Sequence, residues 1–96
     1  MVTQAVHVDR FGNVALGVEH DQFAGIGVKL GRPALVDVGD GRRHQAHYAL
    51  TFADVAPGEL LLYEDSSRRL ALAISRGDAA ATLGIAVDDE LRISPA

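Results

Sequence analysis

Short runs in which apolar and polar residues alternate recur throughout this chain, and Gly, Pro, Asp or Asn separate them. A period of two puts every second side chain on the same face, as in a β-strand that is buried on one side. We count eight such runs, at residues 6–9, 14–18, 26–30, 34–38, 44–52, 59–64, 70–74 and 90–93. Many short strands at even spacing predict an all-β sandwich or barrel.

The connections between the runs refine this expectation. The turn residues after residue 9 predict a hairpin of 6–9 with 14–18, and the polar stretch 65–69 predicts a second hairpin of 59–64 with 70–74. In the longest run, 44–52, the side chains of Ala46, Tyr48, Leu50 and Phe52 are expected on one face. Since closure removes exposed strand edges from a small sheet, we predict a small closed, Greek-key-like β-barrel of about seven or eight strands.

One segment instead favours a helix. Asp78 is a suitable N-cap for residues 79–83, and Gly84 is a natural C-terminal stop. We therefore expect one short helix near Asp78–Leu83.

Composition limits the class of protein. At 96 residues the chain has room for one domain, residues 1–96, and because only 5% of the residues are aromatic its core must be mostly aliphatic. The net charge of −4 argues against nucleic acid as a partner. The absence of cysteine excludes disulfides, and no segment reads as a signal peptide or a membrane helix. We expect no membrane association and a cytoplasmic location.

The turn at residues 9–13 is the strongest candidate for binding chemistry. Asp9, Phe11 and Asn13 alternate around a glycine, so a carboxylate, an aromatic ring and an amide come close together. Such groups could bind a small, polar, aromatic ligand, because an amide offers a donor and an acceptor to a purine edge. The alternative is a purely structural hairpin, since Asp, Gly and Asn are common turn residues.

Other candidates are weaker. His44 and His47 lie three apart in a strand and should point to opposite faces, and no metal site is expected. The stretch Ser66 to Arg69 could bind an anion such as a carboxylate, or it could be an ordinary polar loop. No phosphate-binding loop or nucleophile elbow is present, so the chain contains no convincing catalytic residue.

Five segments taken together point to a family. They are VHVDRFGNV at 6–14, TFADV at 51–55, PGE at 57–59, LALA at 70–73 and GDAAATLG at 77–84. In order and spacing they resemble the C-terminal domain of S-adenosylmethionine (SAM) hydroxide adenosyltransferases, the adenosine-forming SAM hydrolases, and of the related fluorinase and chlorinase. The resemblance extends from about Ala5 to Ile93.

The resemblance implies a role in binding SAM or adenosine. By similarity, Asp9 and Ser66 would hold the methionine end, while Phe11, Asn13 and Phe52 would surround the adenine. The main chain near Ser75 and Arg76 would also touch the base. SAM would be a substrate, and no cofactor is implied.

The resemblance also implies partners. In this family the site is completed by an N-terminal domain, across subunits of a homotrimer, and that domain carries the catalytic residues. The chain by itself is therefore expected to be inactive.

Two departures from the family pattern affect these expectations. The family's Asn-Ser-x-Gly loop reads DSSR at 65–68, with Arg68 in place of glycine. A polar Thr-Asn pair common after the first turn is replaced by Leu16-Gly17.

Two further interpretations stay open. The chain could be a free-standing barrel that binds a nucleoside or serves as a protein-interaction module. Alternatively, residues 80–91 resemble a phrase common in double-psi barrels, although Asp88 replaces its glycine.

Overall fold

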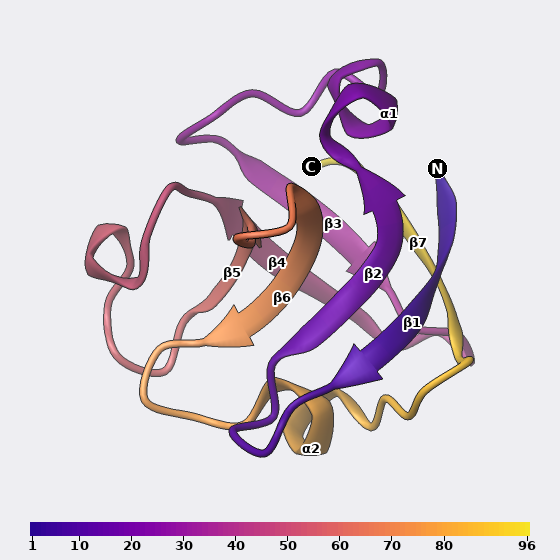
Figure 1. Ribbon diagram of the computed structural model, residues 1–96, viewed down its shortest axis with the longest axis vertical. Helices are drawn as coiled ribbons and strands as arrows, with labels where there is room; N and C mark the ends of the chain where they lie inside the picture. The colour runs from indigo at the N-terminus through magenta and orange to yellow at the C-terminus, as the bar shows by residue number, and fades with distance from the viewer.

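The computed structural model describes all 96 residues and shows a closed barrel of seven strands (Figure 1). The elements in chain order are β1 (Val2–Val8), β2 (Val14–Glu19), α1 (His20–Ala24), β3 (Pro33–Asp37), β4 (Arg43–Tyr48), a 3-10 turn (Phe52–Asp54), β5 (Leu60–Glu64), β6 (Arg69–Ile74), α2 (Ala79–Leu83) and β7 (Glu90–Pro95). Around the barrel the strands follow the order β1-β2-β6-β5-β4-β3-β7. The predicted all-β barrel is confirmed.

Hairpins form most of the wall, and two of the three, β1–β2 and β5–β6, were predicted. β1 pairs with β2, β3 with β4 and β5 with β6, all antiparallel. The connection from β2 to β3 crosses the barrel, because β2 lies beside β6 rather than beside β3. The one parallel pairing, β4 with β5, is short and joins only His47 to Leu61 and Tyr48 to Leu62.

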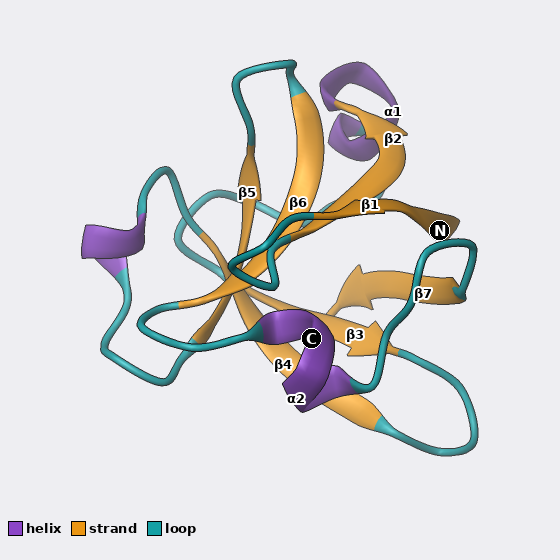
Figure 2. Cartoon of the chain, turned by 60° about the horizontal axis from the view of Figure 1, so that its bottom comes forward, coloured by secondary structure: helices purple, strands orange, loops and turns teal.

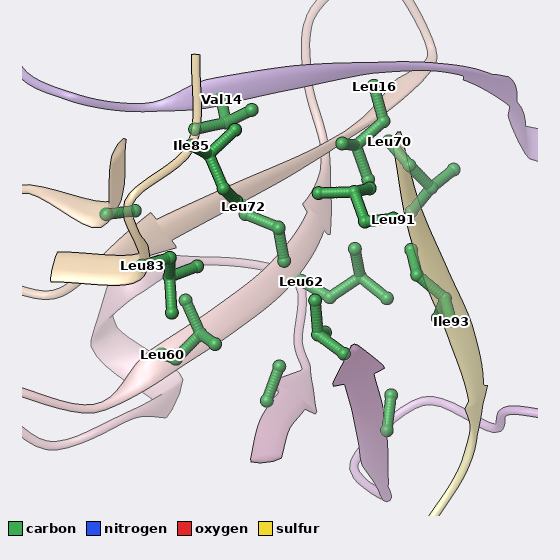
Figure 3. Packing of buried hydrophobic residues seen from close by; sticks show 14 of the residues in the cluster. Val14, Leu16, Leu60, Leu62, Leu70, Leu72, Leu83, Ile85, Leu91 and Ile93 are labelled. Carbon is green, nitrogen blue, oxygen red and sulfur yellow. The ribbon is translucent and has the colours of Figure 1, made fainter. Parts of the chain in front are cut away.

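The core is aliphatic and fills the barrel (Figure 3). Alternate residues of facing strands supply it, including Val14 and Leu16 from β2, Leu62 from β5 and Leu72 from β6, all fully buried. The two helices lie at opposite ends of the barrel (Figures 1 and 2). α1 places Phe23 inside one end, and α2 places Leu83 inside the other.

A second apolar cluster lies outside the barrel. Leu61 and Ala73 project from the outer faces of β5 and β6 and are buried with Ala49, against Val55 and Tyr63. The connection between β4 and β5 therefore folds over the outer face of these strands. The same connection positions Phe52 near the end of β6.

The predicted helix is confirmed in its residues and in both caps. The Asp78 carboxylate accepts a hydrogen bond from the Ala81 amide at 2.9 Å, and Gly84 adopts a positive φ of 69°. The carbonyl of Leu83 also accepts a bond from the Arg42 guanidinium at 3.2 Å.

The predicted strand at 26–30 is wrong, and the barrel has seven strands for this reason. Gly27 and Gly31 adopt φ values of 87° and 83°, in the left-handed region, which is incompatible with an extended strand. Val28 is buried but Leu30 is exposed, so the alternation reflects packing of a loop rather than a sheet.

Helix α1 was not predicted. Glu19 and Gln22 form a reciprocal capping box at its start, and Phe23 packs edge-to-face on Tyr48 with ring centroids 4.9 Å apart. Five residues with a single buried side chain are too short for helical periodicity to appear in the sequence.

Two strand predictions differ from the structure in extent and facing. The strand expected at 44–52 ends at Tyr48, and Leu50 and Phe52 are 68% and 44% exposed rather than facing the core. Thr51 caps the 3-10 turn that replaces the strand.

In β1 a bulge between Ala5 and His7 shifts the register, so Ala5 faces the core while Val6 lies outside.

Candidate functional site

The turn between β1 and β2 is held rigidly by the Asp9 carboxylate. One carboxylate oxygen accepts the amides of Phe11 and Asn13, each at 2.9 Å, and the other accepts the Asn13 side-chain amide at 3.0 Å. Burial raises the pKa of Asp9, but these hydrogen bonds and the nearby His7 outweigh burial and leave that pKa below its ordinary value. Asp9 is therefore an anion whose first task is to fix the orientation of Asn13.

Helix α2 packs against the same turn and supports it. The Gly12 carbonyl accepts the Ala80 amide at 2.9 Å, and Gly12 has a φ of 85°. A Cβ at Gly12 would overlap the Asp78 side chain. The turn needs glycine for its backbone conformation and for this close approach.

Beside the turn lies an open hollow of about 670 Å³, lined by Phe11, Asn13, Phe52, Ile74, Arg76, Gly77 and Asp78. It brings together four of the predicted site residues from three parts of the chain. Phe11 is 63% exposed, an unusual state for a large apolar ring, and Phe52 is also exposed. Two accessible aromatic rings and an oriented amide that line one hollow suit a flat, polar ring that can stack and form hydrogen bonds.

The segment after β6 completes this wall. Arg76 has a φ of 58°, which turns the chain sharply from β6 towards α2. Ser75 is buried, and its main chain is already paired, since its amide donates to Glu59 and its carbonyl accepts from Gly58. Arg76 lines the hollow and Ser75 does not, so Arg76 is the better placed of the two to meet a ligand.

Comparison with known proteins gives this wall a context. The family model described as "SAM hydroxide adenosyltransferase C-terminal domain" matches residues 3–92. The chain belongs to this family. The resemblance inferred from the five motifs is confirmed.

Curated relatives agree with the family match. The chain is 37% identical over 91 residues to an (R)-S-adenosyl-L-methionine hydrolase of Salinispora tropica, covering 95% of this chain and 31% of that protein. It is 35% identical over 92 residues to an (R)-S-adenosyl-L-methionine hydrolase of Salinispora arenicola, with the same coverage of 95% and 31%. The chain thus spans about a third of the length of these relatives, and it matches their C-terminal part.

Solved structures share the fold. An uncharacterized conserved protein from Thermotoga maritima aligns with a TM-score of 0.92 at 35% identity, covering 96% of this chain and 35% of that one. A conserved hypothetical protein from Thermus thermophilus aligns with a TM-score of 0.68 at 28% identity, covering 96% and 34%. The barrel is therefore the fold of about one third of each of these longer chains.

Within this SAM hydroxide adenosyltransferase domain, Ser66 lies apart from the hollow. It is at the tip of the β5–β6 hairpin, whereas Arg76 follows the other end of β6. Six residues of extended strand span roughly 20 Å. The structure therefore does not bring Ser66 into the hollow that Phe11, Asn13, Phe52 and Arg76 line.

The hairpin keeps a tight turn even though the family's glycine is replaced. Asp65 accepts the amides of Ser67 and Arg69 at 2.8 and 3.1 Å, and Arg68 takes the left-handed conformation with a φ of 61°. Arg68 also contacts Glu64 at 3.2 Å. The substitution changes the side chain presented at the turn and leaves the turn itself in place.

Tyr63 is a neighbour of the candidate site that sequence reasoning missed. It lies on the outer face of β5, opposite Ala71 on β6, and its ring centroid is 5.5 Å from that of Phe52. Burial raises the pKa of Tyr63, and the carboxylates of Asp9 and Asp65 raise it further. Tyr63 therefore lies where both carboxylates act on it, between the Asp9 turn and the Ser66 hairpin.

The sequence signal available for Tyr63 was its place in the alternation of the apolar run 59–64. There, Leu60 and Leu62 face the core, and Tyr63 must face outward. In a run this apolar the outward facing of Tyr63 is hard to recognise without the structure.

Among the described residues, no group of three or more His, Asp or Glu side chains is arranged to hold a metal ion. His20 pairs with Glu64 at 2.7 Å, and His47 pairs with Glu59 at 3.2 Å. Neither α1 nor α2 has the length and apolar character of a membrane-spanning helix.

Proposed function

We propose that this barrel is the C-terminal substrate-binding domain of an enzyme that hydrolyses S-adenosylmethionine to adenosine and methionine. The observation that carries the proposal is the hollow in which Phe11, Asn13, Phe52 and Arg76 meet, in a chain of the SAM hydroxide adenosyltransferase family. The adenine would stack on the two exposed phenylalanine rings, and Asn13 would bond to its edge.

The methionine end would extend along the outer face of β5 and β6. Asp9 offers a carboxylate to the amino group, and Tyr63 lies between Asp9 and the hairpin that carries Ser66. In this arrangement Ser66 acts at the far end of an elongated ligand rather than inside the hollow. The Arg68 and Glu64 side chains then set the charge near that end.

The barrel supplies only one wall of the site. The hollow is open to solvent, and none of its residues forms a nucleophile–base pair that could activate water. We therefore assign the reaction to an N-terminal domain, like the remaining two thirds of the curated relatives. In this proposal the site forms between subunits of a homotrimer. No cofactor is required in this proposal, and the enzyme would be cytoplasmic.

A chimera tests the proposal. The Salinispora tropica hydrolase would carry this chain in place of its own matching segment, and adenosine release from SAM would be measured. We expect activity, and we expect Asn13→Ala to lower kcat/KM by about 10- to 100-fold, because the adenine loses an oriented polar partner. Glu90→Gln, an exposed change on β7, is the matched control and should leave the rate unchanged.

The alternative function is a free-standing nucleoside-binding or interaction barrel. Calorimetry of the isolated chain with SAM, adenosine and methionine separates the two. Half of a composite site should bind all three weakly, whereas a self-sufficient binding module should hold one of them tightly. Tight adenosine binding together with an inactive, correctly folded chimera would contradict our proposal.

A further inference from the structure

The segment PGE at 57–59 does not line the hollow, and no role has been given to it so far. The Glu59 amide donates to the Ala56 carbonyl at 3.0 Å, and Gly58, which lies between them, has a φ of 88°. A proline followed by a glycine with positive φ is typical of a type II turn. The segment therefore reverses the chain directly before β5.

The Glu59 side chain closes the same turn a second time. One carboxylate oxygen accepts the Ala56 amide at 2.7 Å, and the other lies 3.2 Å from Nε2 of His47 on β4. Ala56 follows Val55, whose amide donates to the Phe52 carbonyl at 3.3 Å. The carboxylate therefore ties the connection that carries Phe52 to the neighbouring strand.

The main chain of the turn holds a second wall of the hollow. The Gly58 amide donates to the Ser75 carbonyl at 2.8 Å, and the Ser75 amide donates to the Glu59 carbonyl at 3.1 Å. Ser75 directly precedes Arg76, which lines the hollow together with Phe52. The turn therefore joins two segments that lie far apart in the chain and meet at the hollow.

We propose that the Glu59 carboxylate is a positioning group for Phe52, which it holds in place through the Ala56 amide. This inference rests on the proposed function, because the hollow is taken to receive the base of SAM. The main-chain bonds to Ser75 do not depend on the Glu59 side chain. Loss of the carboxylate should therefore displace Phe52 and leave Arg76 in place.

Nuclear magnetic resonance of the full chain tests the positioning without a ligand. The ring centroids of Phe52 and Tyr63 are 5.5 Å apart, so the two rings should show a nuclear Overhauser effect in the natural chain. Glu59→Ala should lose most of this signal, whereas Glu59→Gln should keep it, because the carboxamide oxygen still accepts the Ala56 amide. An undiminished signal in a folded Glu59→Ala protein would overturn the proposal.

Amide hydrogen exchange of the natural chain keeps the test decisive if Glu59→Ala does not fold. The acceptor of the Ala56 amide is the Glu59 carboxylate, so this amide should exchange at least about tenfold more slowly than in an unstructured peptide. Exchange at the unstructured rate would also overturn the proposal.

Asp37→Ala is the matched control. The Asp37 carboxylate likewise accepts a turn amide, from Gly39 at 2.9 Å, and lies 3.6 Å from Arg43, but Asp37 does not line the hollow. This variant loses the same kinds of contact and should keep the signal between Phe52 and Tyr63. Equal loss of the signal in both variants would show a general loosening of the chain and would contradict a specific role for Glu59.

The chimera with the Salinispora tropica hydrolase measures the consequence for SAM. Glu59→Ala should raise KM about three- to tenfold with little change in kcat, because ring stacking supports the base equally in the ground state and the transition state. Glu59→Gln should restore the natural KM, and Asp37→Ala should leave KM unchanged. An active chimera whose KM does not respond to Glu59→Ala would overturn the positioning role alone. A folded chimera with the natural Glu59 that does not act on SAM would instead contradict the proposed function, and the ring signal would still decide the positioning.

Discussion

At the scale of single residues, Asp9 shows how one side chain orders the turn beside a candidate site. Its two oxygens accept three hydrogen bonds within the turn, and these bonds keep Asn13 facing the hollow. A ligand amino group would therefore meet a carboxylate that is already fixed in place. Binding energy then need not be used to order the turn.

The same contacts predict a pH dependence of stability. Because the pKa of Asp9 is lower in the folded chain than its ordinary value, its contribution is present above about pH 4 and is lost as the pH falls through the folded-state pKa. Asp9→Asn should lower the free energy of unfolding by about 1 kcal/mol at neutral pH. In urea unfolding, the difference from the natural chain should shrink on acidification, and a constant difference would contradict this account.

At the scale of elements, the β1–β2 turn and helix α2 stabilise one another. Gly12 is the point of contact, through its carbonyl bond to Ala80 and its close approach to Asp78. The wall of the hollow therefore depends on helix α2, although only the N-cap residue of that helix, Asp78, lines the hollow.

Gly12→Ala tests this coupling. It should destabilise the chain by about 2–4 kcal/mol, because a positive φ costs about 1 kcal/mol and the overlap with Asp78 adds more. Gly39→Ala is the matched control, since Gly39 has a φ of 96° but nothing near its Cβ position, and should cost only about 1 kcal/mol. Thermal unfolding of both variants measures the difference, and equal losses would show that α2 does not restrict the turn.

The β5–β6 hairpin gives a second prediction at this scale. Arg68→Gly relieves the left-handed backbone, whereas Arg68→Ala keeps that conformation and removes the same contact with Glu64. The glycine variant should therefore be more stable than the alanine variant by about 1 kcal/mol in urea unfolding. Equal stability would mean that Arg68 bears no strain in its turn.

At the scale of the whole molecule, the barrel is a rigid support with its binding features on the outside. The aliphatic core occupies the interior, so the candidate site lies on the outer face, the turns and the barrel ends. The accessible rings of Phe11 and Phe52 are consistent with a surface that functions against another domain.

The core supplies a stability prediction. Leu72 is fully buried, beside Val14 on β2 and Leu62 on β5, and Leu72→Ala should cost about 2–5 kcal/mol through lost burial and a cavity. That is a large part of the roughly 5–15 kcal/mol typical of a domain. Leu30→Ala, at a half-exposed loop position, should change the midpoint of urea unfolding little, and a comparable loss there would place Leu30 in the core.

The sequence alone determined the barrel, two of its three hairpins, helix α2 and the family, because these depend on local periodicity, caps and turn residues that neighbours in the chain supply. It also singled out the Asp9 to Asn13 turn, whose hydrogen bonds span only four residues. The features that only the tertiary structure decided depend on contacts between distant segments. Among them are the loop at 26–30, the outward Phe52, the place of Tyr63 and the separation of Ser66 from the hollow. A period of two gives the spacing of side chains but not which face is inside, and strand register and long-range packing settle that question.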